Sequence, residues 1–130
     1  MIKFVYCIRK RADLSDQEFH TYWREKHGAF IRTLTKTLRA KKYIQSHTIN
    51  TPINAELVRG RGLDTPAYDG VTEIWWESME DFLASVNSPE GIEAAKKYVA
   101  DEANFVNFSQ SRAFLTEEHV VFDFSSESEA

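Results

Sequence analysis

The sequence has few of the residues that interrupt or cross-link small proteins. Its 130 residues include one cysteine, three prolines and five glycines. The lone Cys7 excludes an intrachain disulfide, and its place in a strand pattern indicates a buried thiol in a reducing, cytoplasmic setting. No run approaches the roughly 20 apolar residues that a membrane span needs. The N-terminal apolar stretch is too short and too aromatic for a signal peptide. We therefore expect a cytoplasmic protein with no membrane partner.

Common motifs of cofactor and hydrolase chemistry are also missing. The sequence has no glycine-rich phosphate loop, no CxxC pair, no HExxH and no GxSxG. His20 and His27 are seven residues apart, which is not the i, i+4 spacing of a helical metal site. The net charge of −4 argues against a nucleic-acid-binding surface. We expect no cofactor, no metal and no nucleic-acid partner.

What remains is an ordinary globular composition, 42% hydrophobic and 28% charged, in a chain long enough for one domain. Alternating apolar residues predict strands over residues 2–9, 41–50, 71–77 and 111–122. A capping box at Ser15 and Glu18 opens a helix whose predicted apolar stripe is Phe19, Trp23, Phe30 and Leu34. Helices are also predicted over residues 79–86 and 88–102, the second with a stripe of Ile92, Ala95, Tyr98 and Val99. Asn54 is expected to cap one short helical turn within the long connection 51–69.

This order, β-α-β-β-α-β, predicts an α+β, ferredoxin-like fold with a four-stranded antiparallel sheet and both helices on one face. The predicted domain spans residues 1–122, and residues 123–130 form a polar tail expected to be disordered. Bulky residues occur on both faces of the strands, and the chain has nothing left to cover the second face. We therefore expect a homodimer that packs sheet on sheet.

Three ionisable residues lie where apolar side chains are expected. His27 interrupts the helical stripe, and it fits either a hydrogen-bonded core histidine or a general acid or base. His47 lies mid-strand, where it could be a cross-strand polar partner or face a pocket. Glu73 lies within an apolar strand; it is either exposed, or buried beside His47 where it would orient the ring. Our hypothesis is that His27 and His47 face an enclosed pocket.

The same stretches resemble the EthD family of the dimeric α+β barrel superfamily. The resemblance covers about residues 2–120 and rests on the opening strand and on residues 14–15, 19–27, 43–47, 59–60, 68–75, 88–91, 101–102 and 105. Asn107 departs from the pattern, because the family often has Asp there. The resemblance implies a barrel made by two copies, with a pocket in each half. Family members are associated with oxidative breakdown of ethers, and relatives act without cofactors as monooxygenases, decarboxylases, cyclases or dehydratases.

Two functions follow from the residues and the resemblance together. The first is a cofactor-independent enzyme for a small, mostly apolar or aromatic compound, with catalytic His27, His47 and Glu73. The expected pocket walls are Tyr6, Trp23, Tyr43, Trp75 and Phe114. The second is a non-catalytic protein that binds an intermediate for an oxidoreductase system, which needs only shape and apolar area.

Overall fold

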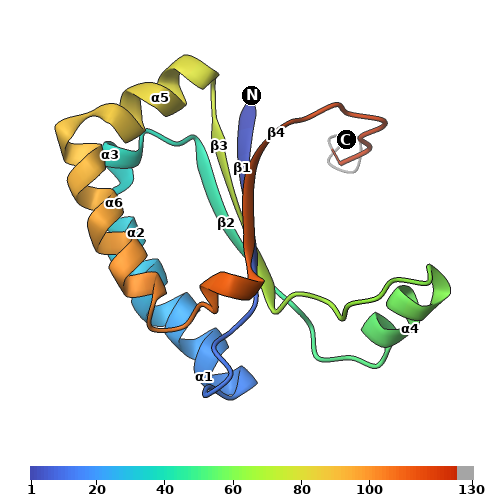
Figure 1. Cartoon of the computed structure of the whole chain (residues 1–130). Helices are drawn as coiled ribbons and strands as arrows, with labels where there is room; N and C mark the ends of the chain where they lie inside the picture. The colour runs from blue at the N-terminus through green and yellow to red at the C-terminus, as the bar shows by residue number, and fades with distance from the viewer. Residues whose placement is uncertain (126–130) are drawn as a thin grey trace.

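The architecture is a four-stranded antiparallel sheet with helices on one face. The computed structural model describes residues 1–125, so residues 126–130 of the predicted tail lie outside the described residues. Strands β1 (Ile2–Ile8), β2 (Lys42–His47), β3 (Gly70–Trp76) and β4 (Arg112–Glu117) pair in the order β2-β3-β1-β4. Figure 1 shows the sheet edge-on, with α2, α5 and α6 on one side. The predicted ferredoxin-like arrangement is confirmed, although β4 ends five residues earlier than expected.

Pairing of the strands decides which side chains face the helices. Tyr6 lies opposite Thr72, and both Phe4 and Tyr43 lie opposite Ile74, so these residues share the helix-facing side. The other side, here called the open face, has no helix of the described residues packed on it in Figure 1. By register, the open face includes Lys3, Val5, Cys7, Lys42, Ile44, Ser46, Val71, Glu73, Trp75, Arg112, Phe114 and Thr116.

The first helical segment contains α1 (Asp16–Thr21), the π-helical η1 (Tyr22–His27), α2 (Gly28–Arg32) and α3 (Thr35–Leu38). The predicted capping box at Ser15 is present. In η1 the backbone N–H of Gly28 donates to the Trp23 carbonyl five residues earlier, so this turn holds one more residue than an α-helical turn. The buried face therefore continues from Trp23 to His27 and Ile31, and the predicted position at Phe30 is wrong by one residue.

Helices α5 (Met79–Asn87) and α6 (Pro89–Glu102) complete the layer. Ser88 ends the first and caps the second, accepting the N–H of Gly91 through its hydroxyl. The buried residues of α6 are Gly91 and Ala94, whereas Ile92 and Val99 of the predicted stripe are 49% and 47% exposed. A methyl group on Gly91 would lie 1.8 Å from the Ser85 carbonyl oxygen, so the absence of a side chain lets the two helices meet here.

The long connection carries α4 (Ile53–Gly60), which Figure 1 shows well away from the other helices. The predicted cap was wrong: Pro52 is the N-cap, and the Asn54 side chain donates instead to the Ile49 carbonyl. A 3-10 turn, η2 (Phe108–Gln110), leads into β4. Over residues 1–125, no helix is long and apolar enough to cross a membrane.

Candidate functional site

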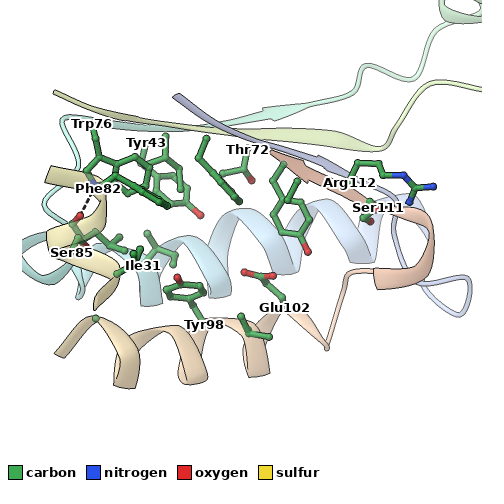
Figure 2. Close-up of a pocket in the computed structure, with 18 of the residues that line it drawn as sticks. Ile31, Tyr43, Thr72, Trp76, Phe82, Ser85, Tyr98, Glu102, Ser111 and Arg112 are labelled. Carbon is green, nitrogen blue, oxygen red and sulfur yellow. Dashed lines mark hydrogen bonds between the residues drawn. The ribbon is translucent and has the colours of Figure 1, made fainter. Parts of the chain in front are cut away.

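A cavity of about 410 Å³ lies between the helix-facing side of the sheet and the helical layer. Figure 2 shows its walls: strands above, α6 and the first helical segment below. The lining is mainly aromatic and aliphatic, and includes Phe4, Tyr6, Ile31, Tyr43, Ile74, Trp76, Phe82, Tyr98, Val99 and Phe108. This volume is within the range of small-molecule sites, roughly 300–1,000 Å³.

Among residues 1–125, Glu102 is the one carboxylic acid that lines the cavity. It is the last residue of α6. Burial raises the pKa of Glu102 to about 7; contact with Tyr6 opposes this effect and the nearby charge of Asp101 adds to it. At neutral pH the carboxyl group is therefore divided between its acid and carboxylate forms. A group of this kind can both take and return a proton.

Three tyrosines surround Glu102. Tyr6 comes from β1, Tyr43 from β2 and Tyr98 from α6. Figure 2 shows the hydroxyls of Tyr43 and Tyr98 and the carboxyl of Glu102 directed into one space. Burial, together with the charge of Glu102, raises the pKa of each of the three phenols. The tyrosines therefore stay protonated and act as hydrogen-bond donors.

His27 lies behind this wall and does not line the cavity. Its ring is 2% exposed, packs on Phe105, and contacts Asp101 with Nδ1 2.6 Å from Oδ2. Burial lowers the pKa of His27, and Asp101 restores it only in part. Burial disfavours the charge of Asp101, but hydrogen bonds from Tyr22 and His27 outweigh it and keep the pKa of that carboxyl below its ordinary value. The neutral imidazole of His27 thus donates from Nδ1 to the Asp101 carboxylate. This hydrogen bond joins η1 to α6 at the residue that precedes Glu102.

His47 is on the helix-facing side of β2 but lies outside the cavity lining. Its ring packs on Trp23 with centroids 4.2 Å apart, and its Nε2 lies 2.8 Å from the Gln45 side-chain oxygen. Because that oxygen can only accept, Nε2 carries the proton and Nδ1 accepts from Nδ1 of His20 at 2.7 Å. Burial, with the nearby His20 and Arg24, lowers the pKa of His47 to about 4. Both ring nitrogens are occupied by neighbours.

Glu73 is on the open face, so the sheet separates it from the cavity and from His47. Its carboxylate accepts from the Lys3 ammonium at 2.8 Å. Trp75 and Phe114 lie on the same face, and Trp23 belongs to the buried core with Ile8, Phe19, Phe105 and Val106. Of the five expected pocket walls, only Tyr6 and Tyr43 line the cavity.

The sequence pattern contains a signal for Glu102. Tyr98 belongs to the predicted apolar stripe of its helix, and Glu102 follows it at i+4, on the same face. Like His27, Glu102 is an ionisable residue in an apolar stripe. As for metals, residues 1–125 contain no group of three or more His, Cys, Asp or Glu side chains placed to hold an ion.

Comparison with known proteins places this geometry in a family. A family model, the EthD domain, matches residues 11–109. Among solved structures, an EthD family protein from Bacillus halodurans is 15% identical with a TM-score of 0.60, covering 92% of this chain and 99% of its own. A dimeric protein of unknown function and ferredoxin-like fold from Bacteroides fragilis is 13% identical with a TM-score of 0.56, covering 90% of this chain and 95% of its own.

A third structure is the hydroxynitrile lyase from Passiflora edulis. It is 13% identical with a TM-score of 0.52, and the match covers 92% of this chain and 95% of the lyase. No curated protein matches the sequence. At these identities the structural likenesses establish the fold alone.

Proposed function

Since this chain belongs to the EthD family, we propose that its cavity binds a small, mostly apolar organic compound and that Glu102 transfers a proton to or from it. The observation that carries the proposal is the position of Glu102: it is the one carboxyl of the described residues in an aromatic-lined cavity, and its pKa is raised to about 7. General acids and bases work best when their pKa is near the working pH, and this contributes about 100- to 10,000-fold in rate.

The energetic argument starts from the cost of burial. A carboxyl group that is raised in pKa by desolvation destabilises the folded protein whenever it ionises. An apolar side chain in its place would fill the same wall without that cost. Strained or costly ionisable groups in cavities are typical of functional sites. Glu102 fits that description, whereas the Glu73 carboxylate is on the other face of the sheet and is paired with the Lys3 ammonium at 2.8 Å.

In this proposal the histidines have supporting roles. His27 and Asp101 join η1 to α6, so we assign His27 as a positioning residue for Glu102. His47 completes a hydrogen-bonded chain through Gln45 to the Trp23 carbonyl, which holds β2 against the first helical segment. The hydroxynitrile lyase of Passiflora edulis shares the fold, so a lyase is built on the same arrangement of sheet and helices.

The test combines ligand binding with turnover. Fluorescence titration with naphthalene and other small aromatic compounds should show saturable binding by the wild-type protein and by Glu102→Gln. Any conversion of a bound compound should be lost in Glu102→Gln and kept in Glu93→Gln, the same substitution on the exposed side of α6. Binding that persists with no conversion of any compound would favour the non-catalytic accessory protein. No binding by either protein would refute the proposal.

We also propose that two copies pack through their open faces. Apolar Val5, Ile44, Val71, Trp75 and Phe114 lie together on this face. The ferredoxin-like relative from Bacteroides fragilis is dimeric. A face of this kind is normally covered by another layer of structure.

A further inference from the structure

Two hydroxyl groups in the cavity have no partner among the described residues. Tyr43 and Tyr98 line the cavity from opposite walls, β2 and α6, and neither hydroxyl hydrogen-bonds to another side chain or backbone group of residues 1–125. The Tyr6 hydroxyl differs, since it contacts Glu102. A ligand that fills an apolar cavity and leaves such donors unpaired binds more weakly, because the buried hydroxyls lose their hydrogen bonds to water. The ligand that fits must supply an acceptor.

The charges around the cavity limit that acceptor to a neutral group. Within the part of the chain that the structure describes, Arg112 is the one cationic residue of the lining, and it donates to the carbonyls of Ser109 and Ser111. Figure 2 shows its guanidinium directed away from Tyr43, Tyr98 and Glu102. An anionic ligand at the tyrosines would meet the carboxylate of Glu102 with no cation to offset it. A carbonyl oxygen accepts two hydrogen bonds and carries no charge.

We infer that the substrate is an uncharged carbonyl compound with an ionisable C–H beside the carbonyl, held by Tyr43 and Tyr98 through its oxygen and deprotonated at carbon by Glu102. This inference rests on the proposed function and names its substrate class: enolisable ketones and esters. Tyr43 and Tyr98 bind the oxygen, and Glu102 removes the proton. The tyrosines stay neutral donors, because burial raises their pKa, and Glu102 is the base.

The step is balanced without an oxidant or reductant. The Glu102 carboxylate takes the proton from the carbon, the C–H electron pair becomes a C=C bond, and the carbonyl π electrons move to oxygen. The developing enolate oxygen accepts the two phenolic hydrogen bonds, which strengthen as its charge grows. The protonated Glu102 then returns a proton to the same carbon or to a conjugated one. The result is exchange or isomerisation of the compound.

The experiment follows hydrogen–deuterium exchange at carbon by NMR in D2O, with cyclohexanone, 2-tetralone and ethyl phenylacetate as probes. Wild-type protein should accelerate exchange of at least one probe, and Glu102→Gln should abolish this acceleration. Tyr43→Phe and Tyr98→Phe should each lower it by about 10-fold or more, the usual effect of losing one hydrogen bond to a charged group. Tyr68→Phe is the matched control, because Tyr68 lies outside this cavity, against Arg9.

Binding of naphthalene, which has no acceptor, separates the two proposals. In Tyr43→Phe and Tyr98→Phe, the affinity for naphthalene should stay within about 2-fold of wild type. The affinity for 2-tetralone should fall. If naphthalene binds and no probe exchanges, the carbonyl inference fails and the proposed cavity stands. If exchange is the same in both tyrosine variants as in wild type, the assignment of the two donors is refuted. If neither naphthalene nor any probe binds, both proposals fail.

Discussion

Replacing Glu102 with glutamine should change how the stability of the protein depends on pH. Burial raises the pKa of Glu102 from 4.5 to about 7, so the folded state binds this proton more tightly than the unfolded state. The stability contributed by the neutral carboxyl is fully present below pH 4.5 and is lost as the pH rises through about 7. At about 1.4 kcal/mol per pKa unit, the two values set an upper limit of roughly 3.5 kcal/mol. Because Glu102 keeps some exposure to the cavity, we expect on the order of 2 kcal/mol.

Glutamine keeps the shape of the neutral carboxyl and cannot ionise. The free energy of unfolding, measured in urea between pH 5 and pH 9, should therefore fall less steeply with pH for Glu102→Gln than for wild type. The two curves should lie close together near pH 5 and be separated by about 2 kcal/mol in favour of the variant near pH 8.5. The groups that face Glu102 are Tyr6, Tyr43 and Tyr98, with Asp101 beside it. Asp101 has a lowered pKa and the phenols raised ones, so they titrate outside most of this range.

Glu93→Gln, on the exposed side of the same helix, serves as the control. It removes an equal charge without relieving a buried one, so its curve should run parallel to that of wild type. A difference between Glu102→Gln and wild type that stays constant from pH 5 to pH 9 would refute the reasoning. The carboxyl would then titrate near its ordinary value, and the proposed proton-transfer role would lose its main support.

Three further predictions concern packing, assembly and titration. Gly70→Ala would place a methyl carbon 2.3 Å from a ring carbon of the buried Trp23. The free energy of unfolding from thermal melts should therefore fall by about 1–3 kcal/mol. Gly60→Ala, where nothing lies within 4 Å, should change the melting temperature little, and equal effects at both positions would contradict this packing. Phe114→Lys on the open face should dissociate the proposed dimer, as measured by light scattering. Leu83→Lys, at a position on α5 that is 44% exposed, should leave the dimer intact. A monomeric wild-type protein would refute the proposed dimer. The imidazole of His47 should stay neutral, with its proton on Nε2, until the pH falls to about 4. Its contribution to the free energy of unfolding should decline as the pH falls below 6.5. Protonation near pH 6.5 in NMR spectra of the ring nitrogens would contradict this network.

Much of the fold could be predicted because its determinants are local. The alternation of Thr72, Ile74 and Trp76 with Glu73 and Trp75 predicts a strand with two distinct faces, and the structure has both. Hydroxyl side chains at Ser78 and Ser88 predict where two helices begin, since each caps the backbone N–H groups within its own first turn. The family resemblance followed from the same local stretches, and the family model confirms it.

The candidate site was predictable only in part. Tyr6 and Tyr43 were expected in the pocket and line it, because strand alternation places both on the helix-facing side. The sequence leaves Glu73 either exposed or buried beside His47, and the register puts it across the sheet from His47. Register depends on which strands pair and where, and a shift of one residue reverses the face of every side chain.

What the sequence by itself determined is therefore the order of the elements and the two faces of each strand, since hydrophobic period and helix caps act over a few residues. Only the tertiary structure decided that the π-helical turn ending at His27 moves the buried face from Phe30 to Ile31. Only the packing of α6 across the sheet brought Glu102 together with Tyr6 and Tyr43, residues far apart in the chain. The raised pKa of Glu102 comes from the low-polarity space that these elements enclose together, and no segment of the sequence creates that space alone.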